Sequence, residues 1–594
     1  MTNTTKSQRK DSIWITDFRS AIQEQSQAVI VPYRLNGQDG YMLRWNGTEA
    51  PILSLPSPVK GWHEIHVGFW GASGCRIRLS NEPFFRWLAS NVRWDRGPND
   101  GEEALWKIAD LTGLAFEFLP FPMEMRCDQR ESQIAYLRLV PISAAQGQQQ
   151  MADLNNRPTR TAGAAFDGHV LGWYLPQSPE ECGAILEPFI DSDFKRIYYG
   201  CTITTHRVNY LSKVGYYLGQ GQSPDSLHTD SNRRCAQALQ TAERKGYDPL
   251  RILIDYAASH SLELWANFRI QQDYAKDYCN GIGEDFVSPL ADAHPEWRLV
   301  DRHGKVWSHK FSHFHPGWEQ YKLDLLAEMA EYGPAGLRLD LTSMAKDIWD
   351  FTPSAVQAFK QKYGMDPTAT DQPPVEWHQF CCDHFTAFLR RLRAQTNRIG
   401  ERLKRQIPIA VQVTADREIL SHPTSDSLAV AANFLYGYDI ASWAREGLVD
   451  IISPSFRSEY RPMFLEHIYE ELGEHRKRVR LIPCVGQYHR AVFPAGYDWS
   501  IYAGAVGIGK RSKLKPLGEL DAWRILREAH DLYQLGADAV DVWEMGEVTH
   551  HLPRWNILKH IGDRKMLRRE FGARIGPMMG FVDHPVTFKS MAST

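Results

Sequence analysis

Residues 1–143 contain short apolar runs separated by glycine, proline and asparagine, the pattern of β-strands. In the run 75–80, Ile77 and Leu79 alternate with two arginines, so one face of the expected strand is apolar and the other is polar. The stretch 102–113 interrupts these strands with the composition of a helix. Further strands are expected at 28–35, 41–45, 63–70 and 134–140. The pattern predicts a β-sandwich-like N-terminal domain.

Residues 144–165 carry few large apolar side chains and show no periodicity, so they are interpreted as a linker. From residue 166 the pattern changes to apolar strands that alternate with amphipathic helices, which is typical of parallel strands covered on the outside. A cap residue followed by proline marks helix starts at Ser178, Asp248 and Thr352. Eight strands are predicted, at 168–175, 196–204, 262–270, 335–341, 407–413, 449–455, 480–488 and 537–545.

Eight strands in this alternation predict an α/β fold, a (β/α)8 TIM barrel, over residues 166–560, followed by a C-terminal extension over 561–594. The loops after the strands are long and those before them are short, so we expect the site at the carboxyl ends of the strands. An open doubly wound sheet is the competing architecture. It is disfavoured because no GxGxxG motif follows the first predicted strand.

Composition narrows the range of partners. The 594 residues include 68 Lys and Arg against 71 Asp and Glu, a net charge of −3, so no electrostatic case exists for nucleic acid or an anionic membrane. No apolar run approaches the roughly 18 residues of a membrane-spanning helix, and the polar start shows no signal peptide, which favours the cytoplasm. Nine cysteines without a CxxC motif argue against a disulfide scaffold or a structural zinc site. The 19 tryptophans could supply platforms for sugar rings.

The fourth predicted strand carries the first candidate. Arg338 and Asp340 alternate with three leucines, so both lie on one face of the strand and are expected to pair. A carboxylate inside a barrel needs such a partner because its isolated burial is costly. Asp340 is therefore the candidate nucleophile or charge stabiliser of a glycosidase. The alternative is a structural ion pair.

Two more carboxylates follow predicted strands: Asp416 after the fifth strand and Glu544 at the end of the eighth. Glycosidases use two carboxyl groups, roughly 5–5.5 Å apart for retention or 6.5–9.5 Å for inversion. Trp543 precedes Glu544, and apolar contact would raise a carboxyl pKa, which suits a proton donor. Asp416 is then the better base or stabiliser. The alternative for each is a buried hydrogen-bonding or loop-capping role.

The same strand ends are rich in cationic and aromatic groups. Arginines there would suit an acidic sugar, or they neutralise the neighbouring carboxylates. The histidine pairs His313/His315 and His550/His551 do not follow the first strand, where a metal hydrolase with an HxH motif would need them, so we predict no metal and no cofactor. The expected substrate-binding residues are Arg338, Arg269, Trp265, Trp543, Tyr488, His489, His206 and Glu459, with Trp265, Trp543 and Tyr488 stacking on sugar.

Several passages carry a family resemblance. They are residues 61–68 with 76–80, 246–250 leading into 265–269, His294-Pro295-Glu296-Trp297, Gly336-Leu337-Arg338-Leu339-Asp340, and 438–455. In these passages the chain resembles the glycosyl-hydrolase-like family 10 group of barrel proteins. The resemblance implies a carbohydrate-active hydrolase on a barrel behind an N-terminal β domain, without implying a substrate. Its relatives carry a further acidic residue near the fourth-strand aspartate, where this chain continues Leu341-Thr342-Ser343.

The sequence therefore predicts a glycoside hydrolase that cleaves an oligo- or polysaccharide, with Asp340 oriented by Arg338 and protonation by Glu544 or Asp416. One alternative is a non-catalytic carbohydrate-binding protein on a degenerate barrel, which would lack two carboxyl groups within about 10 Å in its pocket. The other is a metal-dependent barrel hydrolase, whose activity a chelator would remove. Linkage, anomer and oligomeric state do not follow from the sequence.

Overall fold

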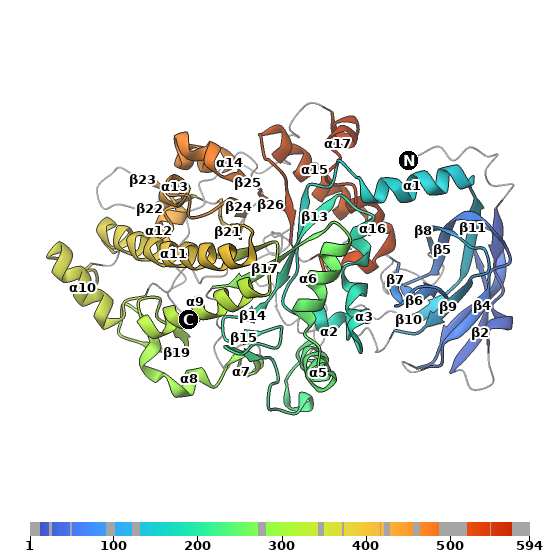
Figure 1. The fold of residues 1–594 in the computed structure, drawn as a ribbon, viewed down its shortest axis with the longest axis horizontal. Coiled ribbons are helices and arrows are strands. Elements are labelled where there is room, and N and C mark those ends of the chain that lie inside the picture. Colours follow the sequence, from blue (N-terminus) through green and yellow to red (C-terminus); the bar gives the residue numbers. More distant parts are fainter. Residues whose placement is uncertain are drawn as a thin grey trace.

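The computed structural model shows a β domain joined to an α/β barrel (Figure 1). It describes residues 12–22, 27–47, 50–90, 101–121, 131–270, 281–342, 350–370, 373–415, 417–420, 428–455, 464–485, 519–543, 545–546 and 548–572. Among these, no helix is both long and apolar enough to cross a membrane.

Two sheets form the N-terminal domain. One has the order β1 (Ile13–Ile15), β11 (Tyr136–Pro141), β5 (Trp62–Trp70) and β8 (Gly101–Asp110). The other has the order β2 (Ala28–Leu35), β3 (Gln38–Trp45), β10 (Glu131–Ile134), β6 (Ser73–Leu79), β9 (Ala115–Leu119) and β4 (Leu53–Pro56), with β7 (Arg86–Ala89) paired to β6. Both contribute to one apolar core, for example Val67 from the first sheet and Ile77 from the second. The prediction of a sandwich-like domain is confirmed.

The helix predicted at 102–113 is wrong, because this stretch is strand β8. Its composition favours a helix, but Ala104 and Trp106 alternate inward into the core, which is the period of a strand. Pairing with β5 along its whole length supplies the backbone hydrogen bonds of this strand. Tertiary pairing therefore outweighs the local helix propensity.

Eight parallel strands close into the predicted barrel. Their order is β12 (Ala162–Ala165), β13 (Phe194–Gly200), β17 (Glu263–Arg269), β20 (Gly336–Asp340), β21 (Ile409–Thr414), β24 (Ile451–Ser455), the pair β25 (Arg480–Leu481) and β26 (Cys484–Val485), and β27 (Asp541–Val542). The ring closes because Asp541 of β27 pairs in register with Gly163 of β12. The (β/α)8 fold and seven of its predicted strands are confirmed.

The first barrel strand is β12 and not the predicted 168–175, where helix α2 (Val170–Tyr174) is found. The prediction failed because β12 reads Ala-Gly-Ala-Ala, without a large apolar residue. Gly163 is required there, since a Cβ atom would lie 2.0 Å from Oδ1 of Asp541. The stretch interpreted as a linker also holds helix α1 (Ala144–Asn155), which begins with a capping box between Ser143 and Gln146.

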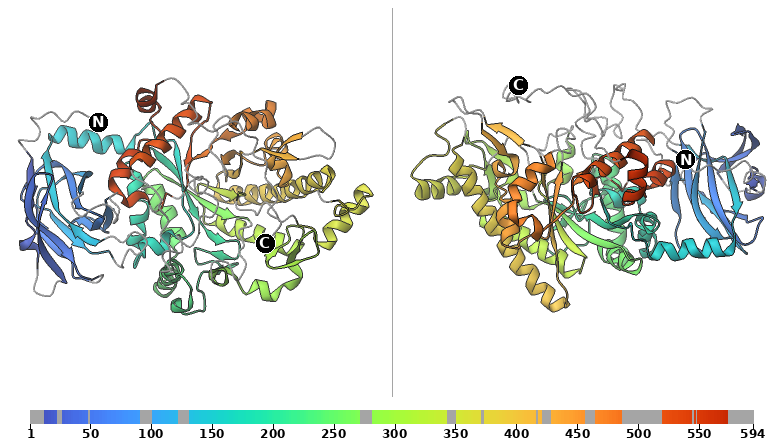
Figure 2. Two further views of the ribbon diagram at one scale, coloured as in Figure 1. Left: turned by 180° about the vertical axis from the view of Figure 1, so that it is seen from behind. Right: turned by 90° about the horizontal axis from the view of Figure 1, so that it is seen from above.

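Helices such as α6 (Pro249–Ser259), α9 (Pro316–Glu331), α11 (Val375–Leu403) and α15 (Glu519–Gln534) cover the outside of the barrel, whereas α10 (Pro353–Tyr363) projects beyond α11 (Figures 1 and 2). The other helices after α2 are α3 (Pro179–Cys182), α4 (Glu187–Ile190), α5 (Asp230–Lys245), α7 (Ile282–Phe286), α8 (Leu290–Ala293), α12 (Ala432–Leu435), α13 (Ile440–Arg445), α14 (Phe464–Leu472), α16 (Leu552–Leu558) and α17 (Arg564–Phe571). Short strands in the loops are β14 (Thr202–Thr204), β15 (Arg207–Val208), β16 (Tyr216–Tyr217), β18 (Arg298–Val300), β19 (Val306–Phe311), β22 (Arg417–Leu420) and β23 (Leu428–Ala431). The outward leucines of β20, Leu337 and Leu339, pack into the core between strands and helices.

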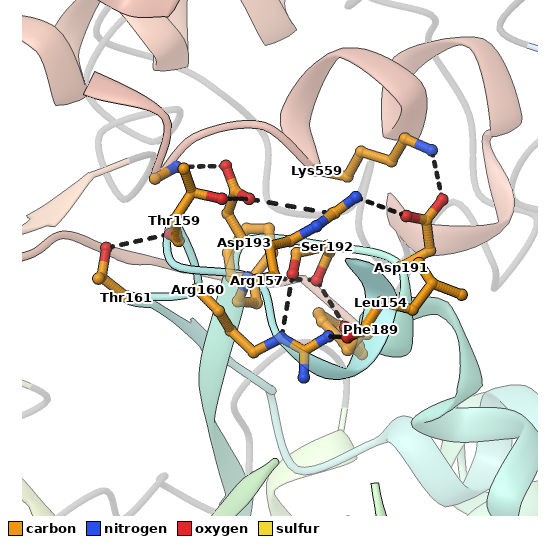
Figure 3. A network of polar contacts seen from close by, with 12 residues as sticks. Leu154, Arg157, Thr159, Arg160, Thr161, Phe189, Asp191, Ser192, Asp193 and Lys559 are labelled. Atoms are coloured by element: carbon orange, nitrogen blue, oxygen red, sulfur yellow. Dashed lines mark hydrogen bonds and ion pairs between the residues drawn. The ribbon is translucent and has the colours of Figure 1, made fainter. Parts of the chain in front are cut away.

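A polar network holds the amino-terminal end of the barrel together (Figure 3). Arg157 donates to Asp191 at 2.8 Å, and Lys559, which follows α16, donates to the other oxygen of the same carboxylate at 2.7 Å. Asp193 accepts from the Thr159 hydroxyl at 2.5 Å and from a backbone N–H near α17 at 3.1 Å. The entry to β12, the entry to β13 and the C-terminal helices are thereby joined.

After β27 the chain returns to the N-terminal domain, and Figure 1 shows α16 between the barrel and that domain. Leu552 of α16 is buried in the core of the N-terminal sheets. Arg86 of β7 donates to the carbonyl of Thr549 at 2.9 Å, and Asn556 donates to the carbonyl of Leu105 at 2.8 Å. The two units therefore share apolar and polar contacts.

Candidate active site

The inward-facing side chains of the barrel form its lumen, and the carboxyl ends of its strands are called the rim below. On β17, Trp265, Asn267 and Arg269 face inward at increasing height. The register of β20 places Gly336, Arg338 and Asp340 beside them in the same order. Apolar groups, including Ala410 of β21 and Ala539, pack with Trp265 in the lumen. The charged groups Arg269 and Asp340 therefore lie at the rim end of the lumen, above the polar pair Asn267 and Arg338.

Asp340 is the last residue of β20 and is fully buried. The backbone N–H of Thr342 donates to its Oδ1 at 3.0 Å, and the Thr342 hydroxyl donates to the same atom at 2.7 Å. Its Oδ2 lies 3.8 Å from Nε of Arg269. This carboxylate is thus held in one orientation by a tight turn on one side and a guanidinium on the other. Its position at the end of the fourth strand agrees with the sequence prediction.

Arg269 lies between two carboxylates. Its Nη2 donates to Oδ1 of Asp167, and its Nη1 donates to the carbonyl of Ile203 at 3.0 Å. With Asp340 at its Nε, one guanidinium joins the rim ends of the first and fourth strands. The nearest oxygens of the two carboxylates consequently lie inside roughly 9.5 Å, the upper limit for a glycosidase pair.

Asp167 was missed in the sequence. It lies two residues beyond β12, and its side chain is 28% exposed, more than that of Arg269 or Asp340. Because the first strand was predicted at 168–175, Asp167 was placed before a strand and not after one. The signal that could have found it is a carboxylate one residue after a run of small residues, between Phe166 and Gly168.

Arg338 does not form the predicted pair with Asp340. Its Nη2 donates to Oε1 of Gln412 on β21 at 2.6 Å, and its guanidinium lies 4.4 Å from the ring centre of Tyr198. The strand period does put Arg338 and Asp340 on one face, as predicted. However, successive inward residues on a strand are separated by about 7 Å, and Arg269 on the next strand is level with Asp340. The cross-strand neighbour therefore takes the place of the same-strand one.

The predicted aromatic and histidine residues are distributed over different depths. The Trp543 ring is 6% exposed and lies 5.7 Å from the guanidinium of Arg269 and 5.8 Å from that of Arg338, so it belongs to the rim group. Trp265 lies four residues before Arg269, at the amino-terminal end of the lumen, edge-on to Tyr198. His206 is buried against Phe311 and Trp318 and contacts the Ser288 hydroxyl at 3.1 Å. The structure therefore places Trp543 beside Arg269, whereas Trp265 lies at the other end of the lumen and His206 packs among aromatic rings.

Five of the predicted site residues lie outside the described residues: Asp416, Glu459, Tyr488, His489 and Glu544. Their assignments stay predictions from the sequence.

The histidine pairs have local partners. His313 contacts Nζ of Lys322 at 2.7 Å, and burial lowers the pKa of His313 well below its usual range. His315 accepts from the backbone of Gly317 at the start of α9. The rings of His550 and His551 lie against each other, 4.3 Å apart. Within the part of the chain that the structure describes, no three His, Cys, Asp or Glu side chains are grouped to hold a metal ion.

A second carboxylate, also missed in the sequence, lies deeper in the lumen. Asp541 on β27 is fully buried, accepts from the Ser453 hydroxyl at 3.2 Å and lies 3.7 Å from Arg196 of β13. Burial raises the pKa of Asp541, and the nearby guanidinium groups of Arg196 and Arg338 oppose that rise. Its position two residues before Trp543 places it one layer below the rim.

No protein-family model and no curated protein matches this chain. Among solved structures it is similar to the PgaB (BpsB) glycoside hydrolase domain from Bordetella bronchiseptica, over 67% of this chain and 97% of that one, at 11% identity and a TM-score of 0.39. It is also similar to alpha-L-fucosidase isoenzyme 2 from Paenibacillus thiaminolyticus, over 69% of this chain and 50% of that one, at 11% identity and a TM-score of 0.33. That match spans half of the fucosidase. A third similar structure is the alpha-galactosidase TtGalA from Thermus thermophilus, over 92% of this chain and 95% of that one, at 12% identity and a TM-score of 0.31. The barrel fold itself rests on the strand pairings described above.

Proposed function

We propose that this protein is a glycoside hydrolase that uses the rim of the barrel as its active site. The observation that supports this most is the arrangement of Asp167, Arg269 and Asp340, in which one guanidinium holds two carboxylates from different strands. Cleavage of a glycosidic bond needs two carboxyl groups at such a separation. The site also agrees with the position of active sites in barrel enzymes, at the carboxyl ends of the strands.

In the proposed reaction, Asp340 acts on the anomeric carbon as nucleophile or as stabiliser of the oxocarbenium-like transition state. Its second oxygen is occupied by the Thr342 donors, so one oxygen faces Arg269 and the site. A second carboxyl group gives its proton to the leaving oxygen, and water then completes the hydrolysis. Asp167, which shares Arg269 with Asp340, is one candidate for this second group. From the sequence we retain Glu544 as the proposed donor and Asp416 as the proposed base or stabiliser. Arg269 is a positioning residue, because it fixes the orientation of Asp340.

The non-catalytic alternative, a carbohydrate-binding protein on a degenerate barrel, predicts no pair of nearby carboxyl groups in the site. The shared contacts of Asp167 and Asp340 with Arg269 favour the enzyme. The metal-dependent alternative is tested directly by activity before and after exhaustive treatment with EDTA. We expect hydrolysis to survive this treatment, since the carboxylate reaction needs no metal.

The test of the proposed function is Asp340→Asn. The wild-type protein is assayed against a panel of aryl glycosides and oligosaccharides by release of aglycone and of reducing ends. The amide has the shape of the carboxylate but carries no charge, so turnover should fall by orders of magnitude while the fold is kept. Asp383→Asn is the matched control, because Asp383 lies on the surface of α11 in an ion pair with Lys362 at 2.9 Å.

Equal activity of Asp340→Asn and wild type would exclude Asp340 from the reaction. Absence of cleavage across the whole panel, together with sugar binding, would instead support the carbohydrate-binding alternative. Asp340→Asn, unlike the control, should lose some thermal stability, since Arg269 loses one of its two acidic neighbours.

A further inference from the structure

Arg338 is a buried cation that forms no ion pair with any carboxylate in the described part of the chain. It is fully buried, and an arginine keeps its charge when buried. Its one strong hydrogen bond is to the neutral amide of Gln412, while its Nε and Nη1 donate to no described residue. The rings of Tyr198 and Trp543 also lie beside it, and Asp541 is near enough for the charge of Arg338 to lower the pKa of that carboxyl. A charge removed from water in this way is costly unless an anion lies beside it.

Among the described groups around Arg338, none is a carboxylate in direct contact with it. Burial raises the pKa of the nearby Cys484 thiol to about 12, so the thiol is neutral. Asp541 forms its ion pair with Arg196, at 3.7 Å, and its own pKa is raised by burial. Arg196 is thus a useful contrast: it is an equally buried arginine of the same lumen with a carboxylate partner inside the protein.

Asn267 lies beside Arg338 and is unpartnered as well. The two residues are register partners on β17 and β20 and face the same lumen. Asn267 is fully buried, and neither its Oδ1 nor its Nδ2 has a hydrogen-bond partner among the described residues. Buried amides are almost always hydrogen-bonded. Two adjacent side chains therefore offer N–H donors to a group that the protein itself does not provide.

These donors belong to the proposed active site by position. Arg338 and Asn267 are each two residues below a rim residue on the same face of the same strand, Asp340 and Arg269 respectively. That separation is about 7 Å, roughly the width of one sugar ring with its substituent. The guanidinium groups of Arg338 and Arg269 also lie within 5.8 Å of the centre of the same indole, Trp543.

We propose that Arg338 and Asn267 bind the carboxylate of an acidic sugar, so that the substrate is a uronic-acid-containing glycan with its charged substituent pointing into the lumen below Asp340. Arginine recognises carboxylates through short, charge-assisted hydrogen bonds. The amide N–H of Asn267 adds a second donor from the neighbouring strand. This inference rests on the proposed function for the sugar, but the binding of a carboxylate can be measured without catalysis.

The experiment compares full-length wild type with Arg338→Met and Arg196→Met by thermal unfolding and by calorimetric titration. The probes are glucuronic and galacturonic acid and oligosaccharides that carry them, with glucose, galactose and the matching neutral oligosaccharides. We expect wild type to bind the acidic probes at least about tenfold more tightly than the neutral ones, and Arg338→Met to lose this preference. Free Arg338→Met should unfold at an unchanged or higher temperature, since Asp541 keeps its ion pair with Arg196. Arg196→Met should unfold at a lower one, because Asp541 loses its partner.

Asn267→Asp is a second variant, which tests the proposal by adding an anion inside the protein. It places a carboxylate beside Arg338, so the thermal midpoint of the free protein should rise and binding of the acidic probes should be abolished. A fall in the midpoint of both Arg338→Met and Arg196→Met with unchanged preference for uronates would show that Arg338 is structural and overturn the proposal. Equal affinity of wild type for acidic and neutral probes would overturn it too.

The two proposals fail in different ways. Preferential uronate binding without cleavage of any glycoside keeps the carboxylate site and overturns the hydrolase. Cleavage that is confined to neutral glycosides keeps the hydrolase and overturns the carboxylate site.

Discussion

The residue that protonates the leaving oxygen decides which substrates are cleaved quickly. We propose Glu544 for this role, because it follows Trp543 in the sequence and the Trp543 ring is buried. In Glu544→Gln, substrates with poor leaving groups should lose far more activity than activated aryl glycosides, which need little protonation. The measurement is kcat/KM for a series of aryl glycosides of graded leaving-group acidity, in wild type and variant.

Asp416→Asn is the comparison for that series. If only this variant showed the dependence on the leaving group, Asp416 would be the donor and Glu544 would not. If both substrate types fell equally in Glu544→Gln, the residue would not be the acid.

A second residue-scale prediction concerns Asp193, in the network at the amino-terminal end of the barrel (Figure 3). Burial raises the pKa of Asp193 to about 6, whereas the pKa of an aspartate in an unfolded chain is about 3.9. Between these values the folded protein binds more protons than the unfolded chain, so stability falls as pH rises. The contribution of Asp193 to the free energy of unfolding is complete below about pH 4 and lost above about pH 6. The total loss is on the order of 3 kcal/mol.

Asp193→Asn removes this titration. Thermal unfolding of wild type and variant is compared at steps from pH 4 to pH 7. The midpoint of thermal unfolding should be lower in the variant at every pH, because one of the acceptors for Thr159 and the backbone N–H of Gly562 is lost. With rising pH, however, this midpoint should fall less than that of wild type. Parallel pH profiles for the two proteins would contradict the raised pKa.

At the scale of elements, what the sequence could predict depended on how much apolar area each strand buries. The fourth strand, with its outward leucines, and the sixth, Ile451–Ser455, were placed to within two residues because long apolar runs face the helices. β12 was missed because it packs through small side chains, and β8 was taken for a helix because its pairing partner is distant in sequence. Periodicity reports burial on one face but carries no information about a partner strand.

The same reasoning separates the site residues that were found from those that were not. Asp340 was found because its strand was correct. Asp167 was missed with β12, and the partner of Asp340 was misassigned because register between strands is not visible in one sequence. The sequence favoured Glu544 over Asp541, because the active sites of barrel enzymes lie at the carboxyl ends of the strands and Asp541 precedes that end.

Gly163 on β12 gives an element-scale prediction. In Gly163→Ala the new methyl group would lie 2.0 Å from Oδ1 of the buried Asp541 and 2.8 Å from the Tyr198 ring. Overpacking of this kind costs about 1–3 kcal/mol, so the thermal midpoint should fall. The control is Gly47→Ala, whose methyl group meets the Gln27 amide oxygen at 2.2 Å, an exposed and flexible side chain that can move away. A similar loss of stability in both variants would mean that the closure of the barrel at β12 is not tightly packed.

At the scale of the whole molecule, α16 connects the barrel to the N-terminal domain. Leu552 is 2% exposed and belongs to the apolar core of the two N-terminal sheets. Truncation of a buried leucine to alanine costs about 2–5 kcal/mol, so Leu552→Ala should lower the unfolding temperature and speed proteolysis within the N-terminal sheets. Leu403→Ala, at the exposed end of α11, is the control and should change neither. Unchanged proteolysis in Leu552→Ala would show that the N-terminal core is complete without α16.

The burial of Leu552 also affects how the protein is made. A ribosome adds about 5–20 residues per second, so α16 emerges roughly 20–80 seconds after β11, the last strand of the N-terminal sheets, has been synthesised. During that interval the N-terminal sheets lack one of their own core side chains and expose the apolar surface that it covers. The first domain to be synthesised is therefore among the last to be completed, and a nascent chain stopped before α16 presents a binding surface for chaperones.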